Sequence, residues 1–171
     1  MGVDLATLRK PLTGVGNYQL NLLKAVLEHS DAPDLFGFQW AWRKLDRDLL
    51  KQMAQNSHPA RSAVLTALAR TILDRPLMRR AYTYGRGRIF RNSLAKRSFA
   101  IFHAFAFVPP APIQSRVLPV VYDLSFIRHP DLHPASRVQS LRRLKSELEH
   151  SDHIHTISNF SAAEICDVYQ I

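Results

Sequence analysis

The 171-residue sequence holds a single cysteine, Cys166, so no disulfide can form within the chain and a disulfide-stapled secreted scaffold is excluded. It also lacks a run of roughly 18 apolar residues, which excludes a membrane-crossing helix. The start of the chain, residues 1–5, has neither a basic lead-in nor a long apolar stretch, so we do not interpret it as a signal peptide. A reducing, cytoplasmic location is the expectation that follows.

Acidic side chains are scarce in the centre of the chain. Residues 61–98 hold 10 basic side chains and one acidic residue, Asp74, whereas residues 1–60 and 99–171 are nearly balanced. The formal net charge of +9 therefore arises from this central stretch. A field of this kind attracts an anionic membrane face, a phosphate-bearing ligand or nucleic acid, and a merely solubilising surface is the alternative. The candidate anion or membrane contacts are Arg70, Arg79, Arg80, Arg86 and Arg88.

The hydrophobic content of 46% suffices for the core of one domain, which at this length buries about 70% of its unfolded surface. Periodicity predicts strands and helices in alternation. The strands are expected at 2–5, 35–42, 99–104, 117–122 and 153–157, and the helices at 17–29, 45–55, 62–81, 134–151 and 161–169. Such alternation indicates an α/β fold, a Rossmann-like parallel sheet with helices on both faces, in one domain over residues 1–171.

Glycine and proline positions predict where these elements are interrupted. Residues 10–17 form a turn-rich loop with two glycines, and residues 84–88, with the sequence YGRGR, are expected to be a flexible basic loop. Pro76 is expected to kink or divide the helix over 62–81. Pro119 removes a ladder donor and argues against a regular central strand at 117–122.

Ligands of an open parallel sheet bind beyond the carboxyl ends of the strands. That rule selects the loop with Gly14 and Gly16, where main chain can approach a phosphate, although tight turns alone would also explain both glycines. It also selects His103, either a buried imidazole or a ligand of the cleft, and Asp123, which we expect to cap the following turn rather than act as a general acid. Ser158 is expected to start a turn or helix and to face the cleft.

Histidines at 129, 133, 150, 153 and 155 suggest a metal site at first sight. Prolines 130 and 134 prevent the first two from sharing one helix face, and neither cysteine nor a dense carboxylate set accompanies the five imidazoles. We therefore predict no metal.

Four segments of the chain resemble family 4 glycosyltransferases. They occur in the order found in the amino-terminal half of those enzymes, and the resemblance spans nearly the whole chain, weakest between residues 43 and 98. The segments are PLTGVGNY at 11–18, FHA at 102–104 with FVPP at 107–110, YDLSFIRHP at 122–130 and ISNFSAAEI at 157–165.

The resemblance implies a two-domain GT-B enzyme of polysaccharide biosynthesis. Such an enzyme moves a sugar from a nucleotide sugar to a glycan or lipid-linked acceptor, with retention of configuration and without a metal or other cofactor. This chain would be its acceptor-side domain, with the cleft lined by Gly14, Val15, Gly16, Asn17, His103 and Ser158. Relatives often dock on the inner membrane face through basic amphipathic surface in this domain, which agrees with the charge of residues 61–98.

Two departures from the family pattern affect catalysis. A histidine usually precedes Asp-Leu, but here Tyr122 precedes Asp123, and a tyrosine offers an O–H but no neutral base near pH 7. These two residues are the catalytic candidates by position alone. The donor-binding domain is absent from the sequence, so we expect a truncated or split enzyme that is inactive without a second polypeptide. The alternative function is a basic membrane- or nucleic-acid-binding module without catalysis, and scarce aromatic residues between 61 and 98 argue against nucleic acid.

Overall fold

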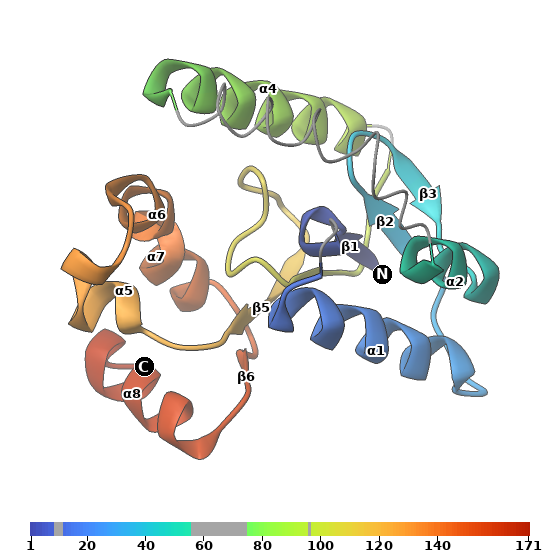
Figure 1. Ribbon diagram of the computed structural model, residues 1–171. Helices are drawn as coiled ribbons and strands as arrows, with labels where there is room; N and C mark the ends of the chain where they lie inside the picture. The colour runs from blue at the N-terminus through green and yellow to red at the C-terminus, as the bar shows by residue number, and fades with distance from the viewer. Residues whose placement is uncertain (9–11, 56–74, 96) are drawn as a thin grey trace.

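The computed structural model describes residues 1–8, 12–55, 75–95 and 97–171 (Figure 1). Most of the helix expected over 62–81 lies outside these residues, as does Arg70. The side chain of Arg79 is likewise outside the description.

The described strands form one sheet in the order β3-β2-β1-β4-β5-β6. All neighbouring pairs are parallel except β2 and β3, which are antiparallel. The chain runs outward from β1 to β2 and β3 and then returns to β4 on the other side of β1, so the switch point of the sheet lies between β1 and β4. The strands are β1 Gly2–Asp4, β2 Phe36–Phe38, β3 Trp42–Lys44, β4 Ile101–Ala104, β5 Arg116–Val121 and β6 His155–Thr156.

Helices cover both faces of this sheet, and α1 and α4 lie on opposite sides of it (Figure 1). Two buried apolar clusters match these two faces: Leu20 and Leu23 of α1 belong to the larger one, and Phe90 of α4 belongs to the smaller one with Phe38 and Phe102. The helices are α1 Gly14–Glu28, α2 Arg47–Gln55, α4 Pro76–Leu94, α5 Ser125–Arg128, α6 Ala135–Ser140, α7 Leu144–Glu149 and α8 Asn159–Tyr169, with short 3₁₀ turns η1 Ala6–Leu8, η2 Pro130–Leu132 and η3 Leu141–Arg143. The predicted α/β class with a mostly parallel, helix-covered sheet is confirmed.

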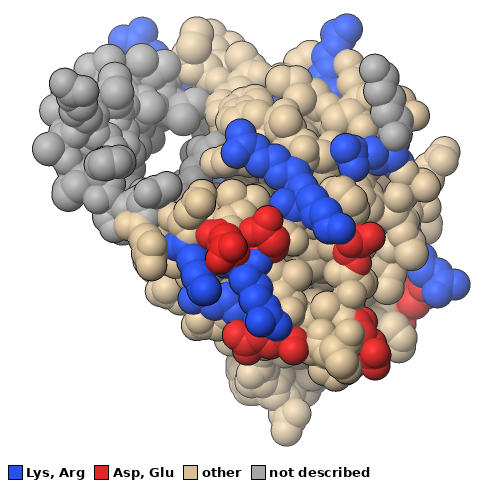
Figure 2. Space-filling view, turned by 90° about the vertical axis from the view of Figure 1, so that its right-hand side faces the viewer, with Lys and Arg blue, Asp and Glu red and all other residues tan. Residues whose placement is uncertain are grey.

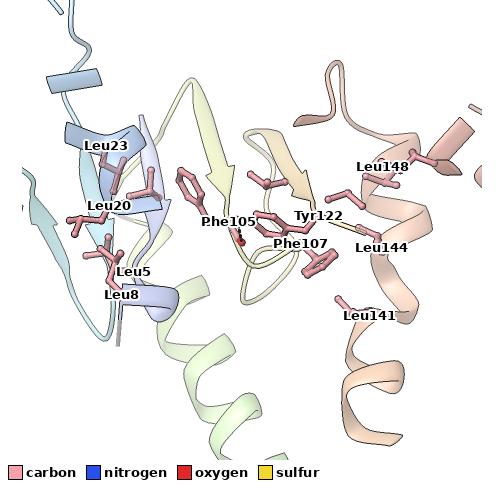
Figure 3. Close-up of a cluster of buried hydrophobic side chains, with 14 of the residues drawn as sticks. Leu5, Leu8, Leu20, Leu23, Phe105, Phe107, Tyr122, Leu141, Leu144 and Leu148 are labelled. Atoms are coloured by element: carbon pink, nitrogen blue, oxygen red, sulfur yellow. Dashed lines mark hydrogen bonds between the residues drawn. The ribbon is translucent and has the colours of Figure 1, made fainter. Parts of the chain in front are cut away.

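The larger cluster extends from α1 to the opposite end of the sheet (Figure 3). In the close-up, Leu20 and Leu23 lie at one end and Leu144 at the other, with Phe105 and Tyr122 between them. Leu23 and Leu144 are fully buried. Loss of such a side chain to alanine typically costs about 2–5 kcal/mol, so this cluster holds the strand ends in place.

The strand expected over 35–42 is wrong in one respect: it is two strands. A tight turn at Gln39–Ala41 reverses the chain, and Trp42 then returns beside Phe38 with ring centroids 5.3 Å apart. Both rings pack against Phe90 of α4, so burial of aromatic surface favours the hairpin over a single long strand.

Pro119 lies inside β5, which has neighbours on both sides. Its position explains why a proline is tolerated there: residues 116–119 pair with β4, and the pairing with β6 involves Val120 and Val121 instead. The proline marks the change of partner, where a ladder donor is not required on both sides.

The glycine loop expected at 10–17 is partly helix, because α1 begins at Gly14 rather than at Asn17. Thr13 is the N-cap, and its Oγ1 accepts a hydrogen bond of 3.3 Å from the Gly16 N–H. Gly16 is buried against η1, where a Cβ would lie 2.5 Å from the carbonyl oxygen of Thr7. Close packing of two main-chain segments therefore explains this glycine.

The flexible basic loop expected at 84–88 is wrong, since these residues lie within α4. Pro76 occupies the first turn of that helix, where its missing N–H is not needed, and the extended N-cap Arg75 precedes it. The proline therefore lies at a helix start, which is compatible with the expected division, and the expected helix before residue 75 lies outside the described residues. Phe90 and Gly87 are buried on the side of α4 that faces the sheet, and Gly87 lies against the carbonyl of Pro110. Tertiary contacts of this kind outweigh the low helix propensity of glycine.

Two expectations about the last third change in detail. The helix over 134–151 is interrupted by η3 between α6 and α7. The last helix begins at Asn159, not Ser161, because Ser158 is its N-cap. The hydroxyl of Ser158 accepts a hydrogen bond of 3.1 Å from the Ser161 N–H. Ser161 therefore lies in the first turn of the helix rather than at its start.

Candidate functional site

The carboxyl ends of the parallel strands share one edge of the sheet. Most of the predicted site residues that the structure describes lie at these strand ends or just after them. Asp4, Ala104 and Val121 are the last residues of β1, β4 and β5. α1 and α8 both begin beyond this edge, each after a hydroxyl N-cap, at Thr13 and Ser158. The fold thus gathers two helix N-termini with unpaired N–H groups at the edge where ligands of such sheets bind.

The first turn of α1 separates two kinds of glycine. Gly14 is exposed, and a Cβ there would meet nothing within 4 Å. Its backbone is helical rather than left-handed, so neither packing nor conformation requires glycine at this position. Val15 is half-buried against the core and Asn17 is exposed. An open glycine at a helix N-terminus leaves the main chain accessible to an anionic group.

A buried ion pair, which the sequence patterns did not indicate, lies at the switch point. The guanidinium of Arg86 on α4 contacts the carboxylate of Asp4, and their side chains are 12% and 3% exposed. The carboxylate of Asp4 also accepts a hydrogen bond of 2.9 Å from the Ala6 N–H. The main-chain carbonyl of Asp4 accepts a hydrogen bond of 2.6 Å from Gln19 Nε2. The one available signal was a carboxylate ending an otherwise apolar first strand.

Arg86 therefore cannot serve as a surface anion contact, and that prediction is wrong for this residue. The helix turns its side chain inward, over the ring of Phe38 at 5.6 Å, instead of toward solvent. Among the described residues its Nε has no hydrogen-bond partner. Arg80 and Arg88 are exposed, and their contact with an anionic surface stays a prediction.

His103 is buried in β4 and stacks beside His155 of β6, with ring centroids 5.7 Å apart. Burial, together with the charge of His155, lowers the pKa of His103 to about 4, so its imidazole is neutral near pH 7. Its Nε2 has no hydrogen-bond partner among the described residues. His155 in turn shares a hydrogen bond of 2.6 Å with the hydroxyl of Tyr18 on α1. The sequence patterns did not indicate Tyr18 as a site residue. Burial raises the pKa of its phenol.

Tyr122 occupies the centre of the larger core and is 8% exposed. Its hydroxyl donates a hydrogen bond of 3.1 Å to the carbonyl of Phe105 (Figure 3). Burial, with a smaller contribution from Tyr18, raises the pKa of Tyr122 well above that of an ordinary phenol. A buried hydroxyl that is already donating and resists ionisation is suited to hold the loop after β4, and the geometry gives no support to a catalytic role.

Asp123 is exposed at the end of β5, and its carboxylate is engaged locally. One oxygen accepts hydrogen bonds of 2.9 Å from the Ser125 N–H and 2.5 Å from the Ser125 hydroxyl. This arrangement starts α5 and matches the expected capping role. Ser158 is also exposed, and its hydroxyl lies 3.0 Å from that of Ser161, which donates to the carbonyl of Tyr122.

The loop after β4 is held in an uncommon backbone conformation at this edge. Phe107 has a φ of 70°. The Val108 N–H closes a tight turn around it by donating a hydrogen bond of 2.9 Å to the carbonyl of Ala106. Arg143 donates a hydrogen bond of 2.9 Å to the carbonyl of Pro109 and so fixes the later part of the loop. A left-handed residue that is not glycine stores roughly 1–3 kcal/mol of strain, which is typical of backbone positioned for function.

The charge of the surface differs between faces. Figure 2 shows basic and acidic side chains interleaved on the side of β3 and α2. Lys44 of β3 pairs with Asp34 at 2.6 Å, and Lys51 of α2 pairs with Asp48 at 3.8 Å. Helix α4, by contrast, contains no acidic residue. Its outward side is a stripe, here called the outer stripe, made of Leu77, Arg80, Tyr84, Arg88 and Arg91, all exposed.

Residues able to hold a metal do not gather in the described part of the chain, where no group of three or more His, Cys, Asp or Glu side chains lies together. In the same part, no helix is both long enough and apolar enough to cross a bilayer.

The chain is similar to O-antigen chain mannosyltransferase B of Escherichia coli. The two sequences are 27% identical over 167 residues, which is 95% of this chain and 42% of the Escherichia coli protein. The chain thus spans less than half the length of that relative. No protein-family model matches the chain, and no solved structure matches it. The similarity supports a relationship to glycosyltransferases.

Proposed function

We propose that this chain is the acceptor-side, Rossmann-like half of a GT-B glycosyltransferase of family 4 that uses a nucleotide sugar as donor. The observation that carries the proposal is the similarity to a mannosyltransferase along 95% of the chain. The fold agrees with it, because α1 and α8 both present their N-termini at the carboxyl edge of the sheet. The donor-binding half belongs, in this proposal, to a further domain or a second polypeptide.

In the transfer, the bond between the anomeric carbon and the donor phosphate oxygen breaks, and its electron pair leaves with the phosphate. A new bond forms to the acceptor hydroxyl oxygen, whose proton passes to the departing phosphate. The positive end of α1, with Gly14 as the point of closest approach, stabilises the charge that develops on that phosphate. Neutral His103 lies beneath this edge beside His155 and keeps the site free of added positive charge near pH 7.

Ligand binding to the purified chain tests whether this half binds the acceptor and the other half binds the donor. We expect saturation-transfer NMR to detect mannose oligosaccharides but no nucleotide sugar, because the nucleotide site lies in the other half. Binding of nucleotide sugars without oligosaccharides would reverse the assignment of halves. Absence of binding to both, together with steeply salt-dependent binding to duplex nucleic acid, would favour the basic-module alternative.

A second function, docking on an anionic membrane, is favoured by the outer stripe of α4. Arg80, Arg88 and Arg91 provide charge, and Leu77 and Tyr84, which are 77% and 68% exposed, provide apolar and interfacial surface. No acidic side chain on the helix offsets the charge. We propose that this stripe holds the protein on the membrane that carries its acceptor.

Vesicle sedimentation at low salt tests the docking proposal. Replacing Arg80 and Arg88 by glutamate is expected to weaken binding to phosphatidylglycerol vesicles about tenfold or more, since each basic residue near such a surface contributes about 1 kcal/mol. Lys51→Glu on the mixed-charge α2 serves as the control and should have little effect. Equal loss in both variants would reduce the effect to net charge and reject the stripe.

A further inference from the structure

Helix α4 has a third side, between the outer stripe and the side that faces the sheet, and this side carries no charge. Met78, Tyr82, Gly85 and Ile89 lie along it at helical spacings of three or four residues. Met78 and Ile89 are 49% and 42% exposed, and Tyr82 is half-buried. The remainder of this helix surface is rich in arginine, so an uncharged side suits a neutral ligand better than an anionic one.

Trp40 faces this side of the helix from the turn after β2. Its ring meets that of Tyr82 edge-on, with centroids 5.4 Å apart and an interplanar angle of 85°, and 43% of the residue is exposed. One turn further along α4, Arg86 reaches Asp4 at the carboxyl end of β1. The aromatic pair therefore lies at the carboxyl edge of the sheet, where the proposed acceptor binds.

Gly85 provides an independent observation at the same place. Glycine inside a helix weakens it relative to alanine, so its presence usually has a packing or conformational reason. At Gly87 that reason is clear, because a Cβ would lie 3.0 Å from the carbonyl of Pro110. At Gly85 a Cβ would meet nothing within 4 Å, and the backbone is helical. The main chain of Gly85 is therefore open beside Tyr82, where a side chain at this position would otherwise hinder a flat ligand.

We propose that Trp40, Tyr82 and the open main chain at Gly85 form a subsite for a neutral pyranose of the acceptor glycan. The exposed face of an indole is electron-rich, and the C–H bonds on one face of a pyranose pack favourably against it. The subsite rests on the proposed function and extends it from a general acceptor edge to a stated contact. It is distinct from the membrane stripe, because Tyr82 and Tyr84 are two residues apart and a helix turns by about 200° over that distance.

Saturation-transfer NMR with mannotriose on the full 171-residue chain tests the subsite. Trp40→Ala is expected to weaken the Kd about fivefold or more through loss of stacking, and Gly85→Ala to weaken it through the added methyl group. Gly85→Ala should also raise the Tm, which separates weaker binding from unfolding. Leu132→Ala removes an exposed apolar side chain on η2, at the other end of the sheet, and should leave the Kd unchanged.

The outcomes separate the subsite from the proposed function. If the wild-type chain binds mannotriose and both variants bind equally well, the subsite is rejected and the acceptor-side function stands. If the wild-type chain binds no oligosaccharide, both are rejected. If Trp40→Ala releases the protein from phosphatidylglycerol vesicles but leaves the Kd for mannotriose unchanged, the aromatic pair is a membrane contact and the subsite is overturned.

Discussion

Arg86, in the middle of α4, forms an ion pair with Asp4, the last residue of β1, and the pair is almost completely removed from solvent. It ties the helix over one face of the sheet to the strand at the switch point. The same arginine would have been a surface anion contact had residues 84–88 been a loop. Its burial shows how one long-range contact converts a charged residue of the sequence into part of the framework.

Removing one member of this pair is expected to be strongly destabilising. Arg86→Met leaves the buried Asp4 carboxylate without its guanidinium partner, although the Ala6 N–H still donates to it, and we expect the free energy of unfolding to fall by about 3–5 kcal/mol. Urea denaturation measures the change. Adding Asp4→Asn to this variant should recover part of the loss, whereas Lys44→Ala, which breaks the exposed pair with Asp34, should have little effect. A small loss for Arg86→Met would show that the pair is not a structural tie.

The two glycines at the start of α1 should respond in opposite directions. Gly16→Ala forces a Cβ against the carbonyl of Thr7, so we expect a loss of about 1–3 kcal/mol in unfolding free energy. Gly14→Ala meets open space in a helical position and should gain up to about 1 kcal/mol while impairing sugar transfer by a completed enzyme. Thermal unfolding and transfer rates measure the two effects. Full transfer activity in Gly14→Ala would leave this glycine without a role at the donor phosphates.

Stability should depend on pH through His103. Because its pKa is lowered from 6.5 to about 4 on folding, the unfolded chain binds the proton more readily. Stability is therefore fully present above pH 6.5 and declines as pH falls toward 4, by about 2 kcal/mol between pH 7 and pH 5. Urea titrations at several pH values measure the decline, and His103→Phe should flatten it over that interval. An unchanged pH profile in this variant would assign the dependence to other groups.

Tyr122→Phe separates a structural from a catalytic role. Loss of the hydrogen bond to Phe105 should lower the unfolding free energy by about 1 kcal/mol, and transfer by a completed enzyme should persist, because this hydroxyl is buried and already donating. A transfer rate reduced by orders of magnitude in a folded Tyr122→Phe protein would restore Tyr122 as a catalytic residue.

The sequence patterns predicted the class of fold because alternation of apolar strands and amphipathic helices depends on local spacing. They failed where a distant contact decides the outcome. Gly85 and Gly87 indicate a loop locally, yet the burial of Phe90 and the Arg86 contact keep this segment helical. The hairpin at Trp42 likewise depends on a partner more than 45 positions away, at Phe90.

The same distinction applies to the candidate site. Strand ends could be placed from the sequence, and the capping role of Asp123 is a local property of its turn. The pairing of Tyr18 with His155, 137 residues apart, and the burial of His103 and Tyr122 depend on how the strands are ordered in the sheet. Spacing in the sequence carries no direct record of that order.

The most direct test of glycosyl transfer combines the chain with the donor-binding half that the proposal requires. The chain is joined to, or combined with, the carboxy-terminal part of Escherichia coli O-antigen chain mannosyltransferase B and incubated with a panel of nucleotide sugars and a mannose oligosaccharide acceptor. Mass spectrometry should then show the acceptor gaining one hexose residue, with less product when Gly14 is replaced by alanine. An unchanged acceptor, from a folded hybrid that binds both substrates and under conditions in which the intact Escherichia coli protein extends its acceptor, would contradict the assignment as a glycosyltransferase half.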